Sequence, residues 1–66
     1  MNNEQIAALR LVDQAALAVD HAINVYQEDY AAEATALLAA VQDARGVGCT
    51  EAQIAMARNG EIWLPR

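Results

Sequence analysis

Apolar residues recur at alternating spacings of three and four along the first half of the chain, which is the pattern of a long amphipathic helix. The main series consists of Leu9, Val12, Ala16, Val19, Ile23, Tyr26 and Tyr30. A second series runs one residue earlier and is mostly alanine: Ala8, Leu11, Ala15, Ala18, Ala22 and Val25. The two series lie about 100° apart around a helix. Because this arc is too wide for one packed neighbour, we expect the helix to contact two others.

Capping residues mark the start of this helix and of a second one. Asn2 or Asn3 is a favourable N-cap, and Gln5 is placed to complete a capping box. The heptad pattern breaks further along the chain, and we predict a turn near Glu28 to Tyr30. Asp29 is then expected to cap the second helix.

The second helix is expected to present one apolar face and to stop at a glycine. Gly46 follows Arg45 and is predicted to be the left-handed residue that ends this helix. The predicted apolar face consists of Ala34, Leu37, Leu38, Val41 and Ala44.

A short third helix has the strongest local signal in the chain. Residues 50–53 read Thr-Glu-Ala-Gln, which is a capping box, and Cys49 and Ile54 are spaced as its hydrophobic staple. We predict that this helix runs to about Arg58 and ends at residues 59–60, Asn-Gly.

These elements predict an all-α protein, a small three-helix bundle with a long N-terminal helix, an antiparallel second helix and a short third helix. The length of 66 residues leaves room for one domain, residues 1–66. Sixteen residues are alanine and one is cysteine, so the core is small and has no internal disulfide. We therefore expect a homodimer. Its predicted interface is the alanine series of the first helix: Ala8, Leu11, Ala15, Ala18, Ala22 and Val25.

The charge balance disfavours several classes of partner. Nine acidic residues stand against four arginines, and the formal net charge is −5. This sign does not suit a surface that neutralises phosphates, so direct nucleic-acid binding is disfavoured. The N-terminus lacks a secretory pattern, and the longest apolar run, residues 36–41, is far below the ~20 residues that span a bilayer. We expect a cytoplasmic protein that does not bind membranes.

Residue types used in catalysis are scarce. The chain has no serine, one histidine, His21, and one cysteine, Cys49, so most catalytic constellations lack a member. These two residues do not supply the ligand set that zinc requires, and Cys49 is expected to be a small buried hydrophobe. The sequence predicts a non-enzymatic protein with no metal and no cofactor.

Leu17 is an aliphatic residue within the polar stripe of the first helix. It lies between Asp13 and Asp20, whose charges would steer a basic partner toward it. We predict that the partner-binding face comprises Asp13, Leu17, Asp20, His21 and Asn24.

The C-terminal segment 61–66 is expected to be extended and apolar, because the residue before Pro65 avoids the helical region. Trp63 lies here between Ile62 and Leu64. It is interpreted either as a lid over the first and third helices or as an additional anchor for the partner.

A small dimeric DNA-binding regulator is the alternative function. Ala44, Gly48 and Ile54 have the spacing of a helix-turn-helix unit. Its second helix would offer the contacts Gln53, Arg58 and Asn59 to DNA.

The acidic residues allow two interpretations, a solvated face that keeps the protein soluble or a mimic of a phosphate backbone. The residues concerned are Asp13, Asp20, Glu28, Asp29, Glu33 and Asp43.

In size, acidity, alanine content and absence of a catalytic set, the chain resembles the small inhibitors made by phages and mobile elements, including anti-CRISPR proteins. The resemblance is one of class and covers no motif, so no residue role is transferred. It implies an acidic inhibitor or regulator that binds a larger protein.

Overall fold

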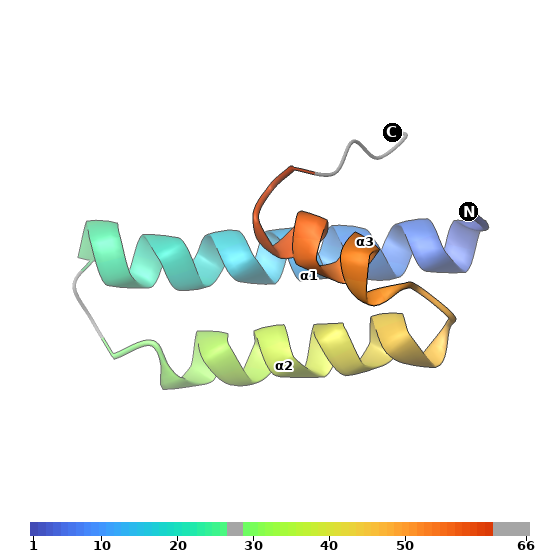
Figure 1. Cartoon of the computed structure of the whole chain (residues 1–66). Coiled ribbons are helices and arrows are strands. Elements are labelled where there is room, and N and C mark those ends of the chain that lie inside the picture. Colours follow the sequence, from blue (N-terminus) through green and yellow to red (C-terminus); the bar gives the residue numbers. More distant parts are fainter. Residues whose placement is uncertain (27–28, 62–66) are drawn as a thin grey trace.

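The computed structural model describes residues 1–26 and 29–61, without the side chains of Val25 and Tyr26. Its elements are α1 (Asn3–His21), a π-helical turn η1 (Ala22–Tyr26), α2 (Ala31–Gly46) and α3 (Glu51–Arg58). The long helices α1 and α2 run antiparallel, and α3 lies against the N-terminal half of α1 (Figure 1). The predicted all-α fold with three helices is confirmed. No helix of the described residues is long and apolar enough to cross a membrane.

The start of α1 is fixed by the predicted capping box. The Gln5 backbone N–H donates to Asn2 Oδ1 at 2.8 Å, and the Asn2 N–H donates to Gln5 Oε1 at 3.0 Å. The amide nitrogen of the same Gln5 side chain donates to the carbonyl of Val47 at 3.1 Å. Gln5 therefore joins the start of α1 to the residue that follows α2.

The break between the first two helices is also confirmed. Asp29 Oδ1 accepts a hydrogen bond from the Ala31 N–H, the first of α2, at 3.0 Å. The residue at the N-cap position is Tyr30, whose side chain makes no capping bond. Asp29 thus supplies the predicted cap from one residue earlier.

The left-handed glycine after α2 is Gly48, with φ of 92°, and not Gly46 as predicted. Gly46 is the last residue of the helix. The N–H of Cys49 donates to the Ala44 carbonyl at 3.0 Å, and the N–H of Gly48 donates to the Arg45 carbonyl at 3.1 Å. These two bonds form a Schellman motif, which satisfies carbonyls that the helix end would otherwise leave unpaired.

The later stop has a physical reason in the packing of the chain. It places Cys49 beside the core, where this residue and Ala44 are both buried. It also leaves Val47 partly buried against the core, with its carbonyl facing the Gln5 amide. A left-handed residue at Gly46 would not give this register.

The third helix matches its prediction closely. The Gln53 N–H donates to Thr50 Oγ1 at 3.1 Å and the Thr50 N–H donates to Gln53 Oε1 at 2.9 Å, which completes the capping box. At the other end Gly60 has φ of 70°, and the Glu61 N–H donates to the Met56 carbonyl at 2.8 Å. Both ends of α3 are therefore fixed by bonds within one or two turns.

An ion pair on the surface joins α2 to α3. Arg45 Nε lies 2.6 Å from Glu51 Oε1, and both side chains are more than half exposed. The guanidinium of Arg45 lowers the pKa of Glu51. Exposed pairs of this kind contribute little to stability, so the core decides the packing of α3.

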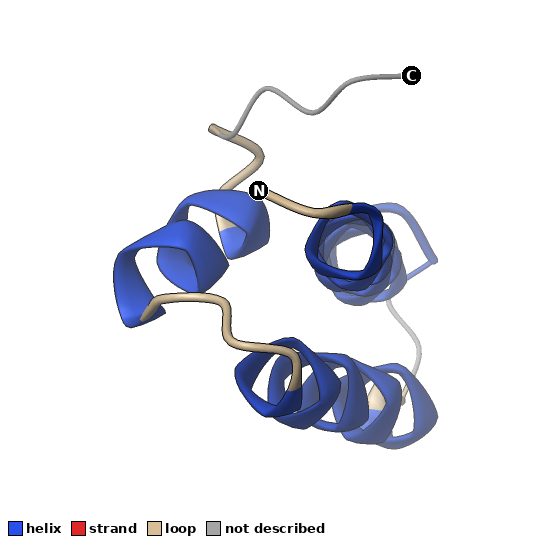
Figure 2. Ribbon diagram, turned by 90° about the vertical axis from the view of Figure 1, so that its right-hand side faces the viewer, coloured by secondary structure: helices blue, strands red, loops and turns tan. Residues whose placement is uncertain are grey.

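The core lies where the three helices meet around a common interior (Figure 2). Its largest fully buried side chains are Leu9 and Val12 of α1. α1 packs against both α2 and α3, which confirms that it has two helical neighbours. Four alanines of the buried cluster permit close approach of the helices. The buried cluster consists of Ala8, Leu9, Val12, Ala40, Val41, Ala44, Cys49, Ile54 and Ala57.

Some residues of the predicted apolar faces are exposed. Leu38 is 56% exposed because it lies about 100° around α2 from Leu37, beyond the buried stripe. In the main apolar series, which begins in α1, Ile23 is 44% exposed and Tyr30 is 47% exposed. Ile23 lies where α3 no longer covers α1 and α2. Tyr30 is the N-cap residue of α2, so the repeat of α1 does not extend to it.

Candidate functional site

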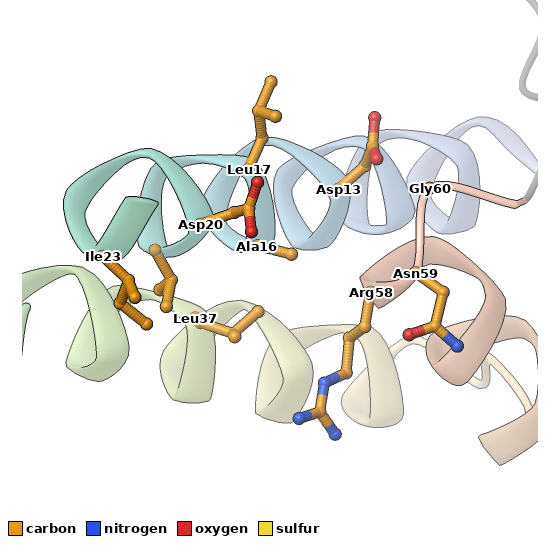
Figure 3. Close-up of a pocket in the computed structure, with 10 residues that line it drawn as sticks. Asp13, Ala16, Leu17, Asp20, Ile23, Leu37, Arg58, Asn59 and Gly60 are labelled. Atoms are coloured by element: carbon orange, nitrogen blue, oxygen red, sulfur yellow. The ribbon is translucent and has the colours of Figure 1, made fainter. Parts of the chain in front are cut away.

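A groove lies where α3 stops short of covering the other two helices. α3 has 8 residues and α1 has 19. α3 ends beside Asp13, whose Oδ1 would be 3.9 Å from a Cβ at Gly60. Beyond this point α3 no longer covers α1 and α2, and the groove between them has a volume of about 490 Å³ (Figure 3).

The floor of the groove is apolar. Ala16 and Val19 of α1 and Leu37 of α2 are partly buried there. Ile23, at the start of η1, lies at the end of the groove farthest from α3 and is 44% exposed. These four side chains form an apolar surface that no described residue covers fully.

An acidic rim borders this floor along α1. Asp13 and Asp20 are seven residues apart, which places them on one side of the helix at about 10.5 Å. The Asn24 side chain donates to Asp20 Oδ1 at 2.7 Å and to the Asp20 carbonyl at 3.0 Å, so it holds the carboxylate in place. Leu17 lies between the two acids, is 55% exposed and points away from α2 in Figure 3. The rim therefore combines two charges with one apolar side chain.

The C-terminal end of α3 closes one end of the groove with Arg58, Asn59 and Gly60. Figure 3 shows the Arg58 side chain extending toward α2. The groove thus has carboxylates along α1 and a guanidinium at the α3 end.

The structure brings three of the predicted partner-binding residues to this groove, namely Asp13, Leu17 and Asp20. Asn24 adjoins them through its bonds to Asp20. His21 is exposed in the last turn of α1 but does not line the groove. Trp63 lies outside the described residues, so its predicted roles stay predictions.

Sequence reasoning missed the contributions of the other helices and of the apolar floor. The predicted partner-binding face does not include Leu37, Arg58, Asn59 or Gly60, and the sequence places Ile23 only in the main apolar series of the first helix. The capping box and the Asn-Gly stop already fix α3 as much shorter than α1. A comparison of the two lengths was the signal that part of α1 would stay uncovered.

The alanine series predicted to form a dimer interface divides into two rows. Ala8 and Ala22 are buried within the chain, and Ala15 packs partly against the core. Leu11 and Ala18, which fall between them in the series, are exposed. The Val25 side chain lies outside the description. Homodimerisation stays a prediction, and in the described part of the chain its accessible contacts are Leu11 and Ala18.

Leu11→Glu is therefore the variant that tests dimerisation through α1. A charge at this exposed position leaves the core intact but opposes close approach of a second α1, so we expect a dimer to dissociate. Sedimentation velocity over a range of concentrations measures this. A parent protein that sediments as a monomer at every concentration would contradict the prediction. Ala22→Glu is a poor test because it would also disturb the fold of a monomer.

Cys49 is buried beside the start of α1. Its thiol donates to the Gln5 carbonyl at a Sγ to O distance of 3.8 Å. Burial raises the pKa of the Cys49 thiol, which keeps it protonated and weakly nucleophilic. Among residues 1–26 and 29–61, no three histidine, cysteine or acidic side chains gather to hold a metal ion.

Comparison with known proteins returns no matching family model, no significantly similar curated protein and no significantly similar solved structure.

Proposed function

We propose that this protein is a non-enzymatic interaction module, a small cytoplasmic inhibitor or regulator that binds a larger basic protein through the groove between α1 and α2. The observation that carries the proposal is the apolar floor left open beside Asp13 and Asp20. Apolar surface within a charged rim is typical of protein interaction sites. Small inhibitors of phages and mobile elements, such as anti-CRISPR proteins, are the class that fits.

The two parts of the groove have different roles in this proposal. The rim carboxylates, with the net charge of −5, attract a basic surface and raise the association rate. The apolar floor, with Ile23 and Leu17 exposed at its edges, excludes water from the contact and slows dissociation.

The alternative of a DNA-binding regulator has less support from the side chains of α3. Gln53, a predicted DNA contact, is held in the capping box. Glu51 places a carboxylate at the start of the helix, where it pairs with Arg45. A protein partner therefore agrees better with the charges that α3 presents.

A matched pair of variants tests the groove. The partner is first isolated from the host with this protein as bait, and its affinity is measured by biolayer interferometry. Ile23→Asp places a charge in the groove and is expected to weaken binding by at least about tenfold. Met56→Asp is the control, because Met56 is 43% exposed, close to the 44% of Ile23, and does not line the groove. Equal affinities of both variants and the parent would show that the partner binds elsewhere.

The charge contribution is tested with two double variants of equal net charge. Asp13→Asn with Asp20→Asn should slow association about tenfold at low salt and reduce its salt dependence. Glu4→Gln with Asp43→Asn removes the same charge away from the groove and should change the rate much less.

An electrophoretic shift with random duplex at two salt concentrations tests the DNA alternative, for which we expect no binding.

A further inference from the structure

The packing of α3 against α1 and α2 shows which kind of segment the surface between these two helices can bind. Ile54 and Ala57 of α3 are 2% and 0% exposed, and they belong to one buried cluster with Leu9, Val12 and Ala44. The N-terminal half of α1, together with the C-terminal half of α2, therefore holds a helix of about two turns.

The groove repeats the surface that α3 covers, one heptad further along. On α1, Leu9 is followed seven residues later by Ala16, and Val12 by Val19. On α2, which runs antiparallel, Ala44 is preceded seven residues earlier by Leu37. Residues seven apart share a helix face, so the groove offers the same pattern of apolar contacts, and no helix of the described residues lies on it.

We infer that the groove binds a second short amphipathic helix, supplied by the basic partner and placed beyond the C-terminal end of α3. This inference rests on the proposed function and adds the form of the bound segment. Its apolar face would contact Val19, Ile23 and Leu37.

Charge favours a cationic helix as the occupant. Asp13 and Asp20 lie seven residues apart along the groove, so lysines or arginines seven apart on an aligned helix would pair with both. A second copy of this chain would bring its own net charge of −5 to the acidic rim, which opposes such a contact.

Three synthetic peptides test the inference on the full chain. The first is a cationic helix of about 14 residues, with leucines and alanines on one face and lysines seven apart on its flank. The second replaces each lysine by glutamate. The third keeps the lysines but has a central proline, which breaks the helix. Binding is followed by the backbone amide shifts of the ¹⁵N-labelled protein.

The cationic helix is expected to shift Ala16, Val19, Ile23 and Leu37 and to leave Met56 unchanged. The acidic peptide should bind about tenfold more weakly, since two exposed ion pairs are lost. The proline peptide should bind at least about tenfold more weakly, because it must form its contacts without a preformed helix. The Ile23→Asp variant should bind the cationic helix more weakly than the parent by a similar factor.

Four results would overturn the inference. The first is that the cationic helix leaves the groove amides unshifted. The second is that the proline peptide binds equally well, which would indicate charge attraction alone. Nuclear Overhauser contacts between the Trp63 indole and the Ile23 or Leu37 methyls in the free protein would assign the groove to this chain's own segment. Shifts of the same amides with protein concentration would assign it to a second copy.

Binding of the protein partner tests the proposed function separately from the peptides. If Ile23→Asp abolishes partner binding while no helical peptide binds, the groove is the binding site and only the helical form of the occupant is wrong. If the partner binds the Ile23→Asp variant as it binds the parent, the proposed function of the groove fails.

Discussion

Leu9→Ala is expected to lower the free energy of unfolding by about 2–5 kcal/mol. Leu9 has no exposed surface and belongs to the buried cluster to which all three helices contribute. Truncation removes apolar contacts from both packed neighbours of α1 and leaves a cavity that so small a core fills poorly. A chain of 66 residues has a total stability of about 3–10 kcal/mol, so this one change should unfold a large fraction of the molecules.

Leu11→Ala is the matched control for this substitution. It removes the same atoms from the same helix, but Leu11 is 52% exposed. We expect a loss below about 1 kcal/mol, since little apolar surface returns to water. Urea unfolding followed by circular dichroism compares the two variants. Equal losses would mean that Leu9 and Leu11 are buried alike, in a dimer or in a different packing of α1.

The parts of the fold that could be predicted from the sequence are those fixed by neighbours in the chain. The capping boxes at Asn2 and Thr50 depend on bonds between residues three apart. The stop after Arg58 depends on Gly60, which reaches a left-handed conformation without steric cost. Such interactions are decided within one or two turns, and the helix ends they mark are confirmed.

The parts that could not be predicted depend on contacts between distant segments. The end of α2 involves the bond from the Gln5 side chain to the Val47 carbonyl, 42 residues away. Ile23 is exposed because α3 ends before it reaches this end of the groove. A helical repeat identifies an apolar stripe, but the length of the packed partner decides how much of the stripe is buried.

The same distinction between local interactions and contacts of distant segments applies to the candidate site. Asp13, Leu17 and Asp20 were predicted together because they lie on one side of one helix. Arg58 and Leu37 reach the groove from α3 and α2, and only the packing of the three helices brings them there.

Gly48→Ala is expected to destabilise the protein by about 1–2 kcal/mol, because Gly48 has φ of 92°, where a Cβ clashes with the neighbouring backbone. The added Cβ would also lie 3.2 Å from Gln5 Nε2. The Gln5 amide must then shift by a few tenths of an ångström, which strains its hydrogen bond to the Val47 carbonyl. The substitution therefore strains the Schellman turn and weakens the link between α1 and the α2–α3 corner.

Gly46→Ala, two residues earlier, should change stability in the opposite direction. Gly46 is the last residue of α2, and an added Cβ meets nothing within 4 Å. Alanine restricts the unfolded chain and favours the helix, so we expect a gain of up to about 1 kcal/mol. Thermal unfolding of both variants measures the difference in sign. If Gly46→Ala is the destabilising variant and Gly48→Ala is tolerated, the left-handed stop lies at Gly46, and the corner that carries Cys49 to the core is built differently.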